Sequence, residues 1–163
     1  MKKILVVLAA AILMVINANA QRPSFIKGDK VLDFTVGVPH LHGYGWGVPP
    51  IIGSFELGIV DGIIENAAVG VGGYAGISSA SLLGKSHFNV HFGVKGAFHY
   101  PFVDNLDTYA GIITGYSVSD LPSYGFDMGA FVGLRYYLSD SFALNAEAGY
   151  GVTYLRGGIS FKF

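Results

Sequence analysis

The most regular feature of this chain is an alternation of apolar and polar residues with a period of two. Between residues 87 and 99 the apolar side chains take one parity and the polar side chains the other: Phe88, Val90, Phe92, Val94 and Phe98 against His87, Asn89, His91, Lys95 and His99. Successive side chains of a β-strand point to opposite faces of its sheet. The pattern therefore predicts a strand with one apolar face and one polar face.

Seven further segments show the same period and are separated by turn residues. Together the eight predicted strands cover residues 29–38, 51–60, 67–77, 87–99, 106–118, 126–136, 142–148 and a last strand that ends at Phe163. An even number of strands suits antiparallel closure, and strands of ~10 residues tilted by about 40° match an apolar band of ~25 Å. The pattern predicts an all-β fold, an eight-stranded antiparallel up-and-down transmembrane β-barrel.

Three details of this prediction concern orientation and strand ends. Apolar side chains of 106–118 fall on both faces, and we favour the orientation that turns four of them outward: Ala110, Ile112, Thr114 and Tyr116. Residues 39–50, 78–86 and 119–123 are expected to form surface loops. Aromatic residues near strand ends are expected to form two interfacial girdles: Tyr100, Phe102, Tyr109, Tyr137, Phe142 and Phe163 at one rim, and Tyr44, Trp46, Tyr116, Tyr124 and Tyr154 at the other.

Residues 1–20 have the features of a cleaved secretory signal peptide. Lys2 and Lys3 supply the positive charge, an apolar run follows, and a small-x-small cleavage pattern ends at Ala20. The apolar run is shorter than the ~20 residues that a membrane-spanning helix needs. We therefore expect export, with residues 21–163 forming the barrel domain.

The composition points to a surface that is not covered by charge. Charged residues make up 13% of the chain, where a soluble domain has about 25%. After the signal peptide no apolar stretch reaches ~18 residues, so a closed barrel is the remaining structure that satisfies every backbone group in lipid. The absence of cysteine excludes disulfides and thiol chemistry. No basic patch is present, so no nucleic-acid partner is expected.

Eight charged residues fall on the inward parity of the predicted strands. They are four acids and four bases: Asp33, Glu56, Asp127, Glu147, Lys95, Arg135, Arg156 and Lys162. An eight-stranded barrel has an interior just wide enough for side chains to fill, and an unpaired charge there is costly. We predict a structural ion-pair network that closes the lumen, in which Arg135 and Glu147 join Glu56 or Lys162.

The chain ends on an apolar stripe of Ile159, Phe161 and Phe163, with Ser160 and Lys162 on the opposite parity. The architecture, the charged interior and this ending resemble the small outer-membrane β-barrels of the OmpA/OmpX type. The resemblance implies that the three apolar residues are an assembly signal read by the barrel assembly machinery. It implies a location in the cell outer membrane, surrounded by outer-membrane lipid.

The function expected from these observations is non-enzymatic. A monomeric barrel with a closed polar core and no cofactor would present short loops, for envelope integrity, adhesion or contact with an extracellular ligand or host surface. Two alternatives remain open at this stage. One is a barrel enzyme that modifies outer-membrane lipid, as a few members of this family are, and the other is a soluble, secreted, lipocalin-like barrel that binds a ligand.

Candidate chemistry in the sequence is sparse. His40 and His42 are weak candidates for metal ligands, because two imidazoles at i and i+2 could share an ion, but no carboxylate or cysteine lies nearby. We expect no metal there. A lipid enzyme would need a serine, a histidine and an acid to converge. Serines of 78–86 lie near His87 without an acid close in sequence, so a triad would have to assemble across strands.

Overall fold

The computed structural model describes residues 24–38, 45–82, 85–119 and 125–163. The predicted signal peptide, His40 and His42 lie outside these residues. Within the described part no helix is long and apolar enough to cross a membrane. The strands of the described part are β1 (Lys30–Val38), β2 (Gly45–Trp46), β3 (Ile51–Asp61), β4 (Ala68–Leu82), β5 (Lys85–Val103), β6 (Leu106–Val118), β7 (Phe126–Ser139), β8 (Phe142–Gly149) and β9 (Leu155–Lys162).

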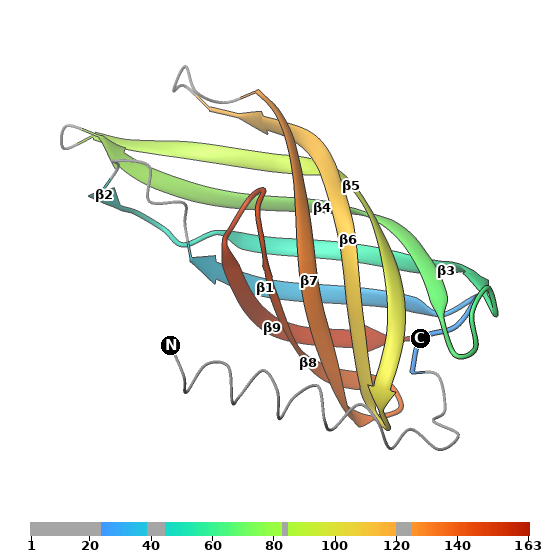
Figure 1. The fold of residues 1–163 in the computed structure, drawn as a ribbon. Helices are drawn as coiled ribbons and strands as arrows, with labels where there is room; N and C mark the ends of the chain where they lie inside the picture. The colour runs from blue at the N-terminus through green and yellow to red at the C-terminus, as the bar shows by residue number, and fades with distance from the viewer. Residues whose placement is uncertain (1–23, 39–44, 83–84, 120–124) are drawn as a thin grey trace, which may run out of the picture.

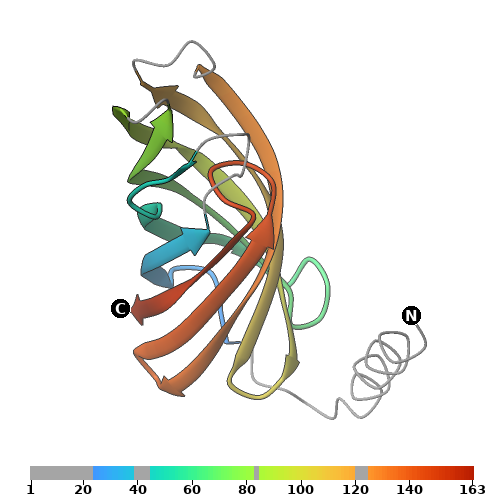
Figure 2. The ribbon, with the colours of Figure 1, turned by 90° about the vertical axis from the view of Figure 1, so that its left-hand side faces the viewer.

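The eight long strands form a closed antiparallel barrel (Figures 1 and 2). Each pairs with the next long strand along the chain, and β9 returns to pair with β1, with Asp33 opposite Ser160. The short β2 pairs with β4 near one end. Every long strand therefore has a partner on both sides, which satisfies backbone groups that lipid cannot. The predicted fold class is confirmed.

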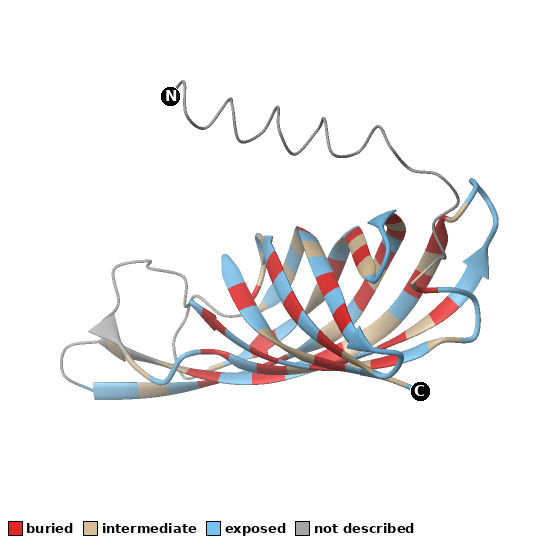
Figure 3. Cartoon of the chain, turned by 90° about the horizontal axis from the view of Figure 1, so that it is seen from below, coloured by how far each residue is buried: buried red, intermediate tan, exposed pale blue. Residues whose placement is uncertain are grey.

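Side-chain orientation follows the predicted parity around the ring, and bands of buried and exposed residues alternate along each strand (Figure 3). In β5, Phe92 is 48% exposed whereas its neighbour His91 is 6% exposed. In β6, Ile112 is 66% exposed and Ile113 is 8% exposed, which confirms the orientation favoured for this strand. Most large apolar side chains of the strands thus face outward, whereas the buried side chains that face inward are mainly polar, with a smaller apolar group among them.

Two aromatic residues assigned to a girdle are placed differently by the structure. Tyr109 and Tyr137 are buried and point into the barrel, because both lie on the inward parity of their strands. Tyr116, Tyr154 and Phe163 are exposed on the outside. Tyr44 and Tyr124 lie outside the described residues.

The predicted loop over 78–86 is mostly strand. β4 continues to Leu82 and β5 begins at Lys85, with Ser78 opposite Asn89. β5 also runs through Pro101, which lies at a register shift where a proline can be tolerated. Loop 39–50 contains the short β2. Of the predicted loop 119–123, only residue 119 lies within the described part.

The two ends of the barrel differ in their connections. The end that we call the turn end holds the start of β1, the end of β9 and connections 62–67, 104–105 and 140–141. One of these tight turns needs a residue with positive φ, and Asn105 supplies it at 61°. The opposite end, the loop end, carries the longer connections between β1 and β3 and between β6 and β7.

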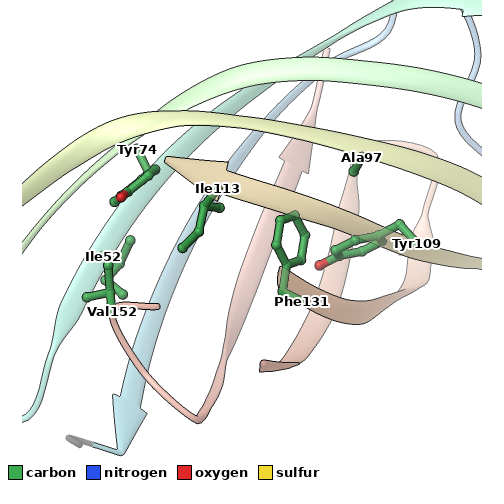
Figure 4. Packing of buried hydrophobic residues seen from close by; sticks show 7 residues of the cluster. All are labelled: Ile52, Tyr74, Ala97, Tyr109, Ile113, Phe131 and Val152. Carbon is green, nitrogen blue, oxygen red and sulfur yellow. The ribbon is translucent and has the colours of Figure 1, made fainter. Parts of the chain in front are cut away.

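The wall of the barrel is uneven in height. β5 has 19 residues and β4 has 15, whereas β8 and β9 have 8 each. Beyond these short strands the connecting segment turns into the barrel, where Val152 is buried against an apolar layer that includes Ile52, Tyr74, Ile113 and Phe131 (Figure 4). The apolar layer crosses the lumen between its two polar regions.

Candidate functional site

The interior of the barrel below the apolar layer is filled with charged side chains. Eight titratable residues from seven strands are buried there, and we call them the charged core: Asp33, Glu56, Lys95, His99, Asp107, Arg135, Glu147 and Arg156. Each lies on an inward-facing position of its strand. A set of this size in a narrow lumen must be paired to be tolerated.

Arg135 lies at the centre of the charged core and is fully buried. Its Nε and Nη2 donate to the two carboxylate oxygens of Asp33 at 3.1 and 3.0 Å. Its Nη1 donates to Asp107 Oδ2 at 3.1 Å, and Nη2 donates to Glu56 Oε2 at 2.5 Å. One guanidinium therefore joins carboxylates from β1, β3 and β6, using the planar fork that suits arginine to this position.

Lys95 lies between the carboxylates bound by Arg135 and the carboxylate of Glu147. Its Nζ lies 3.3 Å from Glu56, 3.8 Å from Asp33 and 3.9 Å from Glu147. The ammonium also lies over the ring of Phe131, 5.4 Å from the centroid. Since Nζ makes no directed hydrogen bond, its role in the core is mainly that of a positive charge among three negative ones.

Glu147 forms the second centre of the charged core. It lies directly opposite Arg156 in the β8–β9 ladder, and Arg156 Nε donates to Glu147 Oε2 at 2.6 Å. Tyr109 donates its hydroxyl to Glu147 Oε1 at 2.8 Å, and the Arg135 guanidinium stacks 4.5 Å from the Tyr109 ring. Gly133 leaves room for this arrangement, because a Cβ there would lie 2.5 Å from the Tyr109 ring. Arg135 and Glu147 are thus linked through Tyr109 and Lys95 and have no direct hydrogen bond.

His99 balances the charge of the core. Its Nδ1 lies 2.9 Å from Asp107 Oδ1, and its Nε2 lies 2.9 Å from Glu56 Oε1. A carboxylate accepts hydrogen bonds, so both ring nitrogens must donate, and the ring that satisfies both contacts is the imidazolium. With His99 charged, four cations face four carboxylates in the charged core.

A second polar cluster lies at the loop end, beyond the apolar layer. His91 Nε2 lies 3.0 Å from Ser78 Oγ, and its Nδ1 lies 2.7 Å from Ser117 Oγ. Asn89 donates to Ser78 Oγ at 3.4 Å. Serine hydroxyls from β4 and β6 thus lie within hydrogen-bond distance of both ring nitrogens.

The structure brings together six of the eight residues predicted for the ion-pair network: Asp33, Glu56, Lys95, Arg135, Glu147 and Arg156. Lys162 lies instead at the turn-end rim, where its Nζ is 3.6 Å from Asp29 and donates to the Ser24 carbonyl. Asp127 lies nearer the loop end opposite Gly115 and is paired with no cation of the charged core. For both residues the predicted inward position does not bring the side chain to the charged core, because the alternation along a strand does not tell how far a side chain lies from the rim.

His99 and Asp107 belong to the charged core although neither was among the predicted members. The favoured orientation of β6 already put position 107 on the inward parity, and His99 lies on the inward parity of β5. Counting inward-facing histidines as possible cations would have identified His99. Including the first residues of each strand would have identified Asp107. Among the described residues, no group of three or more histidine or acidic side chains could hold a metal ion.

Comparison with known proteins supports the fold. A de novo designed transmembrane β-barrel superposes with a TM-score of 0.57 at 17% identity, covering 85% of this chain and 98% of that one. The outer membrane protein OprG from Pseudomonas aeruginosa gives 0.53 at 12% identity, covering 87% and 99%, and the Yersinia pestis outer membrane protein Ail gives 0.52 at 11%, covering 84% and 100%. No protein-family model and no curated protein matches the chain. The chain therefore has the fold of the small eight-stranded membrane barrels.

Proposed function

We propose that this protein is a monomeric, non-enzymatic barrel of the outer membrane, which holds its loop-end segments at the cell surface and does not conduct solutes. The observation that carries the proposal is the charged core. Paired side chains from seven strands occupy the lumen below the apolar layer, so the barrel is a filled scaffold. Envelope integrity, adhesion or contact with an extracellular surface are functions that such a scaffold serves.

The outward face supports the membrane part of this proposal. Large apolar side chains are exposed on every long strand, among them Phe34, Phe55, Phe92, Val132 and Leu144. Lipid, unlike water, is a favourable surrounding for such a surface. The soluble lipocalin-like alternative requires the reverse arrangement, with apolar side chains inside and charges outside, so the observed orientation contradicts it.

The arrangement also disfavours the lipid-modifying alternative. Ser78, His91 and Ser117 are the serine and histidine side chains that the structure brings together across strands. All three are buried inside the barrel, whereas an enzyme acting on membrane lipid needs its reactive groups at the lipid surface. The Nδ1 position of His91, where a catalytic triad places its orienting acid, faces the hydroxyl of Ser117 at 2.7 Å.

The terminal stripe fits a role in assembly. Phe161 and Phe163 are exposed on the outer surface, and the Phe161 ring lies 5.5 Å from that of Phe142. Phe163 could therefore contact a partner protein before the barrel is inserted into lipid. We propose that the barrel assembly machinery reads this stripe, with the interfacial anchor as its second role.

A sided labelling experiment tests the proposed function. A peptide tag would be inserted after Ser119 at the loop end and, as the matched control, after Asp104 at the turn end, and intact cells would be probed with antibody. Outer-membrane fractionation with surface staining of the first tag alone is the expected result. Recovery in the soluble fraction, or staining of the turn-end tag alone, would refute the proposed location or orientation.

Conductance measurements test whether the lumen is closed, and lipid analysis tests whether the protein modifies lipid. Purified protein in planar bilayers should give no stepwise ion current, because the charged core fills the lumen. Mass spectrometry of lipid A from cells with and without the protein should show the same species. Regular single-channel steps would refute the closed lumen, and a changed lipid would establish the enzyme.

A further inference from the structure

The chain before the first strand enters the turn end of the barrel. Phe25 is 2% exposed and lies in a small apolar cluster with Val31 and Ala68. Its ring stacks on the imidazole of His99, with centroids 4.1 Å apart and an interplanar angle of 24°. An aromatic side chain from outside the barrel strands therefore covers the charged core directly.

The backbone of this segment is fixed to the barrel wall rather than resting on it. Gly28 N donates to Gly58 O and Gly58 N donates to Asp29 O, both at 2.9 Å. Lys27 N donates to an Asp61 carboxylate oxygen at 3.1 Å, and Lys162 Nζ donates to the Ser24 carbonyl at 3.1 Å. These bonds attach residues 24–29 to β3 on one side and to β9 on the other.

The wall is shaped to receive the segment. A Cβ at Gly58 would lie 2.1 Å from the Ile26 carbonyl oxygen, so only glycine allows the approach that is seen. Within the segment, Asp29 Oδ2 accepts a hydrogen bond from Ile26 N at 3.1 Å, which holds the turn that directs Phe25 inward. The neighbouring side chain of Ile26 is exposed.

The charged core lies between two apolar covers. On the loop-end side is the apolar layer that includes Ile52, Ile113 and Val152, and on the turn-end side is Phe25. Water at either face would compete for the hydrogen bonds of His99 and Arg135 and weaken their attraction to the carboxylates, since the attraction rises as the local dielectric falls. A seal at both faces keeps that attraction strong.

We propose that residues 24–29 are a built-in plug that seals the turn end of the lumen, with Phe25 as the sealing group over His99 and Gly58 as the seat on the wall. The inference does not depend on the proposed function, because it concerns access of water to the charged core from the turn end. It predicts that His99 is shielded by a segment that can be displaced while the barrel remains closed.

Deuterium exchange at the imidazole C2 position, measured on the folded full-length protein by mass spectrometry, tests this. His87, near the loop end of the same strand and less buried, is the internal reference. Phe25→Ala should raise the exchange rate of His99 on the order of tenfold by opening the site to water and should leave His87 unchanged. Ile26→Ala, which alters an exposed side chain of the same segment, should change neither rate.

Gly58→Ala gives an independent route, because it displaces the segment without altering Phe25. It should also speed exchange at His99, whereas Gly53→Ala on the same strand, whose added Cβ would meet its nearest atoms only at 4.0 Å, should not. Wild-type exchange at His99 in both Phe25→Ala and Gly58→Ala would overturn the plug. Failure of both variants to fold, with both controls folding, would overturn it too, because the segment would then be part of the folding core.

Discussion

Removing the charge of Arg135 should destabilise the barrel more than any other single change in the charged core. Arg135→Met takes away four hydrogen bonds to Asp33, Glu56 and Asp107. Four carboxylates then face three cations. Breaking a buried pair by removing one partner costs about 3–5 kcal/mol, which is on the order of a thousandfold in the folding equilibrium.

A double-mutant cycle separates this electrostatic loss from a loss of packing. Asp33→Asn in the Arg135→Met background removes the carboxylate that lost two of these hydrogen bonds, so the double variant should be less destabilised than the sum of the singles by roughly 1–3 kcal/mol. Arg156→Met is the matched control, because its guanidinium pairs with Glu147 and has no contact with Asp33. The cycle of Arg156→Met with Asp33→Asn should give a clearly smaller coupling, because these two residues are linked only indirectly, through Lys95 and Glu147.

The measurement is reversible urea unfolding in thin bilayers, followed by far-UV circular dichroism and by the gel shift of the folded form. The midpoints should move while the slopes stay constant, since the surface exposed on unfolding is unchanged. Additivity of Arg135→Met and Asp33→Asn would show that the two side chains act independently. That result would refute the claim that the contact between Arg135 and Asp33 stabilises the folded barrel.

Four further predictions address the closed ring, its lipid-facing side chains, the β1–β9 ladder and the C-terminus. Boiled and unboiled samples should migrate differently in SDS gels, because the closed ring has no edge from which detergent can start, and equal mobility would argue against closure. Leu134→Arg should cost about 2–4 kcal/mol by placing a charge against lipid, whereas Leu134→Ala should be mild, and equal effects in bilayer refolding would contradict the orientation. Gly158→Ala should block folding because its Cβ would meet the Phe34 carbonyl oxygen within the ladder, while Gly157→Ala, with 3.5 Å to its nearest atom, should fold normally. Phe163→Ala should insert poorly in cells yet refold normally from urea in detergent, and normal insertion in cells would leave only the anchoring role.

The period of two was sufficient to predict the fold and the facing of each strand. It identified Asp33, Glu56 and Arg135 as inward residues because parity is a local property of a strand. Which of them meet depends on register around the ring. Arg135 and Asp33 are 102 residues apart, and no local pattern encodes that contact.

The errors have the same origin. Lys162 has the predicted parity but lies too near the rim to reach the charged core. Phe25 could not be assigned from periodicity, since it precedes the first strand and its place is set by a turn and by the seat at Gly58. Sequence periodicity thus predicts whether a side chain faces the lumen or the lipid. Its position along the barrel axis and its contacts across the lumen follow only from the register of the closed barrel.

The uneven wall has a consequence for the membrane around the protein. The 8 residues of β8 and of β9 rise ~27 Å along the strand, or ~21 Å across the membrane at a tilt of about 40°, which is less than the ~25 Å apolar band of such barrels. β5, with 19 residues, exceeds that thickness with ease. Hydrophobic mismatch of this kind is relieved by thinning of the bilayer, at a fraction of a kcal/mol per Å. Lipids with short acyl chains should therefore collect beside β8 and β9, and the barrel should sit in an annulus that is thinner on one side than on the other.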